Sequence, residues 1–279
     1  MQGKTVVVTG ATSGIGEVAA LRLAAMGARI VMVARDQGRA VVTRAKLKGA
    51  NPAAEHTVHY GDLSSLADMR RVAHEIADSE PAIDVLINNA GAVFTERRLS
   101  TDGLEMTFAT NHMSYFVITD ILLDRLKATP GARIVSTASD AHKAGKVDFD
   151  NLQSEKSYST FRAYGTSKLE NILFTRELAR RLDGTGVTVN CLHPGGVATR
   201  FGSNNSGWLA AVFGVAIKLV GISPEEGART IIYLASSPDV AGKSGGYYYK
   251  NALVAPSPAA QSDADAKRLW DVSAKIAGI

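Results

Sequence analysis

A tyrosine and a lysine four residues apart are the side chains of this sequence whose types and spacing best suit chemistry. Tyr164 and Lys168 occur in the run Tyr-Gly-Thr-Ser-Lys. Residues four apart on a helix lie on the same face, and a nearby ammonium favours the phenolate and lowers the pKa of a tyrosine. A phenol tuned in this way acts as a general acid or base. The same spacing is typical of a solvated helix face, so other features of the sequence are needed to show whether the pair is catalytic.

The elements that must position this pair alternate between short apolar runs and longer amphipathic ones. Near-continuous Val and Ile runs predict strands of a parallel sheet that is covered on both faces. Their alternation with helices predicts right-handed crossovers and a doubly wound α/β fold of Rossmann type. We expect strands at 5–8, 29–33, 57–60, 85–88, 133–136, 187–192 and 246–249, with helices that include 15–26, 64–77, 104–126 and 163–182. Without a linker or repeat, one domain over 1–279 is expected.

The first expected strand runs into a glycine-rich turn that a helix follows, Thr9-Gly-Ala-Thr-Ser-Gly-Ile-Gly16. Glycine permits a tight turn and lets backbone N–H groups approach a pyrophosphate, and the helix N-terminus favours an anion. The spacing differs from the G-x-G-x-x-G dinucleotide fingerprint. Its place between strand and helix nevertheless favours nucleotide binding over a purely structural turn.

Composition and charge limit the class of protein and its possible partners. The chain has 279 residues, 46% of them hydrophobic, and a net charge of +4, which is ordinary for a globular protein. No Lys/Arg tract is present, so we expect no nucleic-acid partner. A lone cysteine, Cys191, fits a reducing compartment, and we expect no secretory signal and a cytoplasmic location. His112, His142 and His193 lack metal-ligand spacing, so no metal is expected.

Six motifs occur in the order and relative spacing of the short-chain dehydrogenase/reductases, and the chain resembles that family over nearly its whole length. They are the glycine turn, Asn88-Asn-Ala-Gly91, Asn111, Ser139, the Tyr164/Lys168 pair and Pro194-Gly195. The stretches 151–182 and 233–238 are more specifically similar to the retinol-dehydrogenase branch. Those relatives often carry an N-terminal membrane anchor that we do not expect here, so retinoid substrates stay open.

The resemblance implies a nicotinamide-dependent oxidoreductase and a role for each matching residue. Tyr164 would be the acid/base, Lys168 would lower its pKa and bind the nicotinamide ribose, and Ser139 would hold the substrate oxygen. Ser136 also lies at a strand end, but the family register selects Ser139. Asn111 would position Lys168 through water and carry a proton relay, or would merely bond to neighbouring backbone.

The implied cofactor contacts gather at the carboxyl ends of the strands. Asn89 to Gly91 would line the adenosine ribose while Asn88 braces the sheet. Asp62 would receive the adenine amino group or cap the next helix. Backbone at Pro194 and the Thr199 hydroxyl would hold the carboxamide. The expected cofactor residues are Gly10, Thr12, Ser13, Gly14, Ile15, Gly16, Arg35, Arg39, Asp62, Leu63, Asn89, Ala90, Gly91, Tyr164, Lys168, Pro194, Gly195, Val197 and Thr199.

The end of the second strand bears on the choice between NADP and NAD. An acidic residue there bonds the ribose 2′-OH and repels a 2′-phosphate. By register this position is Ala34, followed by Arg35 and, one turn later, Arg39. Guanidinium groups pair with phosphate and stack on adenine, which predicts NADP. Asp36 would favour NAD if the register shifts, and a plain surface role is the alternative for Arg35.

Two insertions point to the substrate side. A loop at about 140–162 carries His142, Phe149 and Tyr158, and the segment 201–222 includes an apolar run with Trp208 and Phe213. The run is too short and interrupted for a membrane span. We predict a lid at about 200–222 over a hydrophobic pocket, with peripheral membrane contact as the alternative.

These features together predict an NADP(H)-dependent oxidoreductase that interconverts a small lipophilic alcohol and its carbonyl compound. A non-catalytic NADP-binding regulatory protein of the same fold is the alternative, but it has no use for an acid/base pair. A sugar epimerase or dehydratase is a third hypothesis, disfavoured by chain length and glycine spacing. By family analogy we expect a homo-oligomer.

Overall fold

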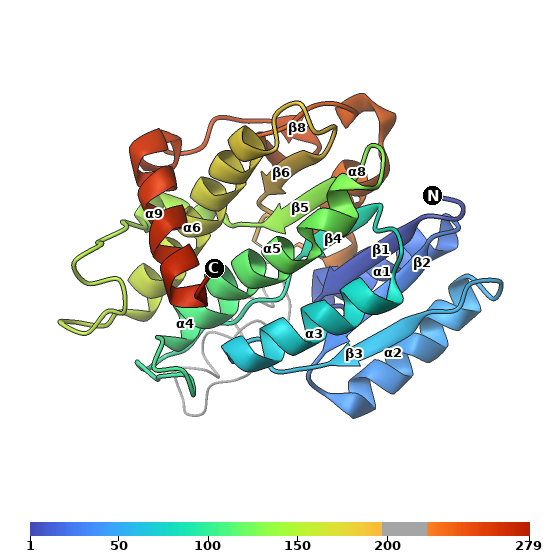
Figure 1. Ribbon diagram of the computed structural model, residues 1–279, viewed down its shortest axis with the longest axis horizontal. Coiled ribbons are helices and arrows are strands. Elements are labelled where there is room, and N and C mark those ends of the chain that lie inside the picture. Colours follow the sequence, from blue (N-terminus) through green and yellow to red (C-terminus); the bar gives the residue numbers. More distant parts are fainter. Residues whose placement is uncertain (197–221) are drawn as a thin grey trace.

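The computed structural model describes residues 1–196 and 222–279, and its centre is one twisted sheet (Figure 1). The strand order is β3-β2-β1-β4-β5-β6-β7-β8, and every pairing is parallel except that of β7 with β8. The strands are β1 (Thr5–Thr9), β2 (Arg29–Ala34), β3 (Thr57–Tyr60), β4 (Val85–Asn88), β5 (Arg133–Thr137), β6 (Thr188–Leu192), β7 (Tyr247–Tyr249) and β8 (Ala252–Leu253). The order reverses between β1 and β4, which is where open α/β sheets bind ligands.

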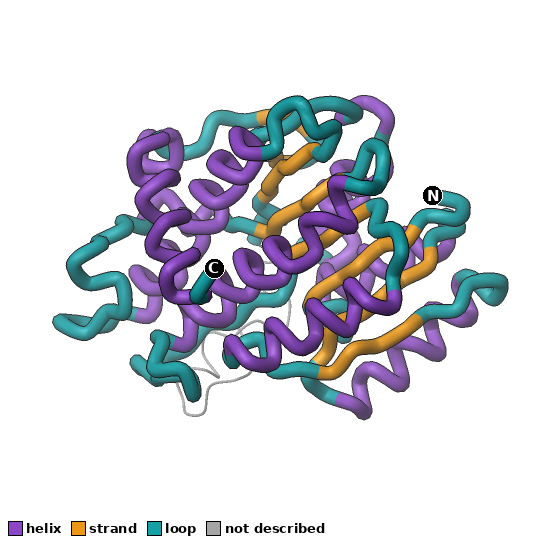
Figure 2. The backbone as a smooth tube through the Cα atoms, in the orientation of Figure 1, coloured by secondary structure: helices purple, strands orange, loops and turns teal. Residues whose placement is uncertain are grey.

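Helices cover both faces of the sheet (Figure 2). One layer holds α3 (Leu66–Ser79), α5 (Ser114–Lys127) and α6 (Thr160–Arg181), with α9 (Asp263–Ala277) packed on α6. The other layer holds α1 (Gly14–Ala25), α2 (Gln37–Ala50) and α8 (Pro224–Ser236). This arrangement confirms the doubly wound Rossmann-type prediction.

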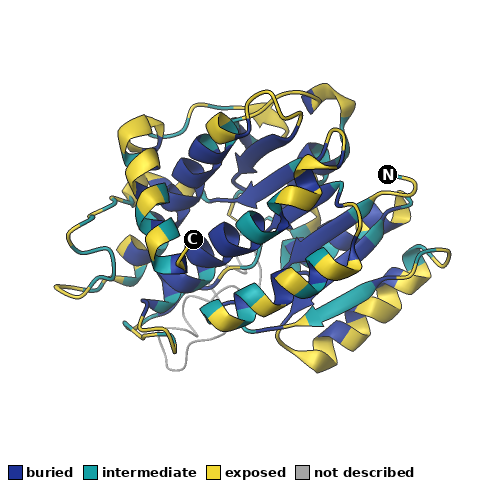
Figure 3. Ribbon diagram, in the orientation of Figure 1, coloured by how far each residue is buried: buried dark blue, intermediate teal, exposed yellow. Residues whose placement is uncertain are grey.

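Alternate residues of the central strands pack into hydrophobic clusters on opposite faces of the sheet, and these strands are buried on both faces (Figure 3). In β1, Val7 packs under α3 and α5, whereas Val6 and Val8 pack under α1 and α8. Such two-sided burial explains why these strands read as continuous apolar runs rather than as alternating ones.

The predicted helix at 104–126 is interrupted near the site. The structure has α4 (Met106–Phe108), a π-helical turn η1 (Ala109–Met113) and then α5. A π-turn adds a residue to the helical ladder and is frequent at functional sites, and this one carries Asn111. Within the described residues, no helix is both long and apolar enough to cross a membrane.

Candidate active site

A cleft of about 320 Å³ opens at the carboxyl ends of the parallel strands. Almost every predicted site residue that the structure describes lines it; Gly16 lies beneath the glycine turn and Asn111 behind the wall. The lining residues that the sequence reasoning named are Gly10, Thr12, Ser13, Gly14, Ile15, Arg35, Arg39, Asp62, Leu63, Asn89, Ala90, Gly91, Ser139, Tyr164, Lys168, Pro194 and Gly195.

The glycine turn is shaped by close backbone approaches. Gly10 has φ +70°, and a Cβ there would lie 2.9 Å from the Cα of Ala90. A Cβ at Gly16 would lie 2.4 Å from the carbonyl oxygen of Gly10. Side chains are therefore barred where the turn meets the cleft floor. The next helix begins at Gly14, and its N-cap Ser13 makes no side-chain capping bond, which leaves first-turn N–H groups for an anion.

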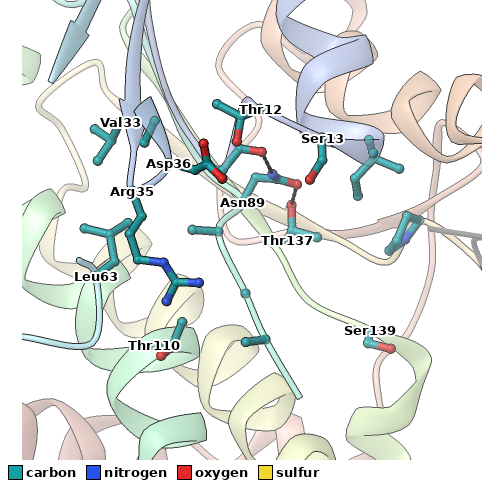
Figure 4. A pocket seen from close by; sticks show the side chains of 18 of the residues that line it. Thr12, Ser13, Val33, Arg35, Asp36, Leu63, Asn89, Thr110, Thr137 and Ser139 are labelled. Carbon is teal, nitrogen blue, oxygen red and sulfur yellow. Dashed lines mark hydrogen bonds between the residues drawn. The ribbon is translucent and has the colours of Figure 1, made fainter. Parts of the chain in front are cut away.

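Asn89 braces this turn against two strands. Its Nδ2 donates to the main-chain oxygens of Thr9 (3.1 Å) and Gly10 (3.3 Å), and its Oδ1 accepts from the Thr137 hydroxyl at 3.4 Å. Figure 4 shows this link at the centre of the cleft. Asn88 is fully buried and donates to the Thr119 hydroxyl instead. The asparagines therefore hold the strand ends in place.

Tyr164 and Lys168 lie on one face of α6, directed at the ends of β4 and β5. The Lys168 Nζ is 5.6 Å from the centre of the Tyr164 ring and donates to the Thr137 carbonyl at 3.2 Å. The Lys168 side chain is almost fully buried, with 2% exposed. A Cβ at Gly91 would lie 3.5 Å from Nζ and 3.3 Å from the Asn111 Oδ1, so a side chain there would crowd both groups.

Burial dominates the electrostatics of this pair. It raises the pKa of Tyr164 to about 12, although a hydrogen bond with Ser139 acts in the opposite direction. It lowers the pKa of Lys168 to about 7. The expected lowering of the tyrosine pKa is therefore wrong for the protein alone, because burial of the phenol itself disfavours the phenolate. At that pH the phenol carries its proton.

Ser139 begins a short 3-10 turn, η2 (Asp140–Ala144), that packs backbone to backbone against α6. Its Oγ accepts from the Ala141 N–H at 3.2 Å, and its hydroxyl also forms the hydrogen bond with Tyr164. A Cβ at Gly165 would lie 2.7 Å from the Ala141 oxygen, and one at Gly145 would lie 2.4 Å from the Gly165 oxygen. Two adjoining glycines thus bring Ser139 up to Tyr164. Ser136, the other candidate, is buried inside β5.

Asn111 holds the backbone behind the cleft. Its Oδ1 accepts from the Ala92 N–H at 2.8 Å, and its Nδ2 donates to the Ala92 oxygen and the Ser167 hydroxyl, both at 3.0 Å. The side-chain amide of Asn111 therefore holds Ala92, the residue after Gly91, and Ser167, the residue before Lys168. This geometry matches the backbone-bonding alternative, and the proton relay stays a prediction.

Charged side chains ring the opposite end of the cleft, beyond β2 and β3. The Arg35 Nη1 lies 3.8 Å from the Asp62 Oδ2, and the Arg35 side chain is 63% exposed. Asp36 is the N-cap of α2 and pairs with Arg39 at 3.2 Å, so its carboxylate already has two partners. Asp62 does not cap α3, because Ser65 does. Strand β2 ends at Ala34, so the residue at the end of this strand is the one that the sequence predicted.

Thr110 is a cleft residue that the sequence reasoning missed. It lies beside Leu63 and Arg35 (Figure 4), and its buried Oγ1 finds no hydrogen-bond partner in the part of the chain that the structure describes. A buried polar atom of this kind needs a partner. The unused N–H groups of the glycine turn and this unpartnered hydroxyl fit a ligand with polar groups along the cleft, such as a nicotinamide dinucleotide. No local motif marks Thr110, apart from its place before Asn111.

Some predicted residues lie outside the described chain. They are Val197, Thr199 and, except for Ile222, the expected lid with Trp208 and Phe213. Among the described residues, no group of three or more His, Cys, Asp or Glu side chains is arranged to hold a metal.

Comparisons with known proteins agree on one family. A family profile described as short chain dehydrogenase matches residues 4–210. The chain is 43% identical to retinol dehydrogenase 14 of Mus musculus over 291 residues, covering 100% of this chain and 87% of that protein. An uncharacterized protein of Mycobacterium paratuberculosis has a solved structure with TM-score 0.79 and 30% identity, covering 99% and 94% of the chains. The Pseudomonas aeruginosa RhlG/NADP complex has TM-score 0.69 and 27% identity, covering 88% and 94%.

Proposed function

Because the chain belongs to the short-chain dehydrogenase family, in its retinol-dehydrogenase-like branch, we propose that it is an NADP(H)-dependent oxidoreductase that interconverts a lipophilic alcohol and its carbonyl compound. The observation that carries the proposal is the meeting of Ser139, Tyr164 and Lys168 in one cleft with the glycine turn. A protein that only sensed the nucleotide would not need a phenol and a hydroxyl there.

The chain's own residues divide the work along the cleft. The glycine turn would hold the pyrophosphate, Asp62 the adenine amino group, and Pro194 and Gly195 the nicotinamide, whose ring supplies or accepts the hydride when bound. With a substrate bound, the Ser139 hydroxyl would donate to the substrate oxygen in place of its bond with Tyr164. Tyr164 gives that oxygen a proton during reduction and takes it back during oxidation. Since its pKa is about 12, the phenol is ready to act as the acid at neutral pH.

The preference for NADP rests on Arg35. Its exposed guanidinium has only a loose ion pair with Asp62, and such exposed pairs contribute little. Arg35 is therefore available to a 2′-phosphate with a bidentate fork. The carboxylate that would serve a ribose hydroxyl, Asp36, is occupied as a helix cap. The NADP named with the structurally similar Pseudomonas protein is consistent with this preference.

The lipophilic substrate is inferred from the cleft wall and from the relatives. Ala92 and Phe94 line the same cleft as Ser139 and Tyr164 and are nearly buried. Apolar walls with few polar groups are typical of small-molecule sites. The relative at 43% identity is named for retinol, an apolar alcohol. The homo-oligomer and the cytoplasmic location stay predictions, and light scattering on the purified chain would measure the first.

A carbonyl panel tests the proposed function. Purified protein is mixed with NADPH or NADH and with aldehydes and ketones graded from short to long apolar chains, and absorbance of the reduced cofactor is followed. We expect consumption of NADPH in preference to NADH and faster turnover of the longer compounds. No turnover with any carbonyl or alcohol, despite tight NADPH binding, would support the regulatory alternative instead.

A further inference from the structure

The turn that carries Ser139 is held from behind by a histidine that the proposed chemistry does not use. His142 lies within η2 and has no exposed surface. Its Nδ1 is 2.8 Å from the main-chain oxygen of Ser139, and its Nε2 is 3.0 Å from the main-chain nitrogen of Ser257. The ring also packs edge-on against Tyr247, with ring centres 5.2 Å apart. The imidazole therefore links two segments that are far apart in the sequence.

The two main-chain partners determine the protonation of the ring. A carbonyl oxygen only accepts hydrogen bonds, and a backbone N–H only donates them. Nδ1 of His142 must therefore carry the proton, and Nε2 must offer its lone pair to the Ser257 N–H. A doubly protonated ring would place two donors face to face at Nε2. Burial lowers the pKa of His142, in agreement with a neutral ring.

The Ser139 carbonyl is the atom that this link holds. It also accepts from the main-chain nitrogen of His142 at 3.1 Å, so the peptide after Ser139 is fixed from two directions. Ser139 itself is extended, with φ −158° and ψ 155°. Rotation of that peptide would change ψ of Ser139 and with it the bond from the Ala141 N–H to the Ser139 Oγ. The imidazole thus controls where the hydroxyl sits.

The far end of the link is firm enough to serve as an anchor. Ser257 lies between β8 and α9, and this segment is tied to β7 by the bond from the Val254 N–H to the Tyr247 oxygen at 2.9 Å. Ala260 is fully buried in the same segment and packs in one cluster with Ala138, next to Ser139. The C-terminal segment therefore forms the back of the active-site turn.

We propose that His142 is a positioning residue that anchors the Ser139 turn to the C-terminal segment and so aligns the Ser139 hydroxyl with the substrate oxygen. The inference rests on the proposed dehydrogenase function. His142 lies outside the cleft lining and acts through Ser139 rather than on the substrate. Its loss should lower kcat while leaving KM and the binding of NADPH nearly unchanged.

Two substitutions separate the two bonds. In His142→Asn the amide occupies the place of Nδ1 and can still donate to the Ser139 oxygen, but it cannot reach Ser257. In His142→Gln the amide reaches the place of Nε2 and can accept from Ser257, but the bond to Ser139 is lost. We expect kcat to fall about 10- to 100-fold in the Gln variant, as for small misplacements of catalytic groups. The Asn variant keeps the bond to Ser139 but loses the anchor to Ser257, so its kcat should fall about threefold or more, though less than that of the Gln variant.

Amide exchange provides a readout that does not depend on activity. By NMR, the Ser257 N–H should be protected in wild type and in His142→Gln but should exchange faster in His142→Asn. Activity would then fall in both variants, whereas protection of the Ser257 N–H would be lost in the Asn variant alone. Equal kcat losses that follow thermal stability would reduce His142 to a structural residue and overturn the proposal. Unchanged kcat in the Gln variant would overturn it as well.

A second pair of variants removes the bond from the other side, in case His142 variants fold poorly. Ser257 has φ −59°, which proline adopts readily, so Ser257→Pro removes the N–H donor while its ring pushes the imidazole away from this position. Ser257→Ala keeps the N–H and is the matched control. We expect the Pro variant to lower kcat about threefold or more and the Ala variant to leave it unchanged; equal values would contradict the anchor. Wild-type protein without any dehydrogenase activity would instead refute the proposed function, while the Ser257 exchange would still report on the link.

Discussion

Replacing Lys168 with methionine should make the protein more stable while removing its activity. Lys168 is buried, and burial lowers its pKa from 10.5 to about 7. At about 1.4 kcal/mol per pKa unit, holding this group in the folded chain costs about 4 kcal/mol at pH 7. Methionine has similar length and no charge. The substitution removes the hydrogen bond from Lys168 to the Thr137 oxygen, which offsets about 1–2 kcal/mol of this gain in stability. The Thr137 oxygen still accepts a hydrogen bond from Asn171. The free energy of unfolding should therefore rise by about 2–3 kcal/mol.

The sign of the pH dependence makes this prediction specific. Between pH 7 and pH 10.5 the unfolded chain binds a proton at this lysine that the folded chain does not hold, so wild-type stability rises with pH. The methionine variant lacks this gain. Its advantage over wild type should shrink by about 3 kcal/mol between pH 7 and pH 10.

Urea unfolding of the cofactor-free protein at pH 7 and pH 10 measures both effects. Lys127→Met, at an exposed position in the last turn of α5, is the control and should change the free energy of unfolding by less than about 0.5 kcal/mol. A Lys168→Met protein that is no more stable than wild type at pH 7, or a difference that does not vary with pH, would refute the reasoning about burial.

Three further predictions follow from the cleft. Arg35→Ala should weaken NADPH binding about ten- to a hundredfold and NADH binding hardly at all, as measured by fluorescence titration; equal weakening would move the assignment to another residue. Alcohol oxidation should speed up about tenfold per pH unit from pH 7 to pH 9, because it needs the phenolate of Tyr164, whose pKa burial raises to about 12, whereas carbonyl reduction should change little; parallel profiles would contradict the raised pKa. Gly165→Ala should reduce kcat, because its Cβ would lie 2.7 Å from the Ala141 oxygen and displace the Ser139 turn. Gly49→Ala in α2 is the control: no atom lies within 4 Å of its Cβ, so it should keep kcat and raise the free energy of unfolding by about 0.5–1 kcal/mol. A Gly165→Ala protein with normal kcat would show that the turn tolerates the shift.

The parallel strands were predictable because a strand that is buried on both faces has a continuous run of apolar residues. Each expected strand occurs in the structure with ends that differ by one residue at most. The hairpin to β8 was not predicted. Its turn uses positive φ at both Lys250 (47°) and Asn251 (64°), and a lysine is not a residue that signals this conformation. The π-turn at Ala109–Met113 was missed as well, since no proline or glycine marks it.

Some features of the site were also predictable from the sequence, and others were visible only in the fold. Residues carried by short motifs, such as the glycine turn and the Tyr164/Lys168 pair, were located by their spacing together with the order of the six motifs in the family. The pKa directions were not, because spacing shows that a lysine is near a tyrosine but not that both are out of water. The link from His142 to Ser257 spans 115 residues, and no local pattern reports such a contact. Asn89 was expected to face the ribose, and only the fold shows its amide committed to Thr9 and Gly10.

The most direct test of the account is the effect of Tyr164→Phe on turnover and on cofactor binding in the same preparation. The phenol hydroxyl is the only group removed, and the ring still packs against α6. Steady-state kinetics on the best carbonyl substrate should show kcat lower by about 10²–10⁴-fold, with the Kd for NADPH within a few-fold of wild type. A Tyr164→Phe protein that retains near-wild-type kcat would contradict the assignment of Tyr164 as the proton donor and the mechanism built on it.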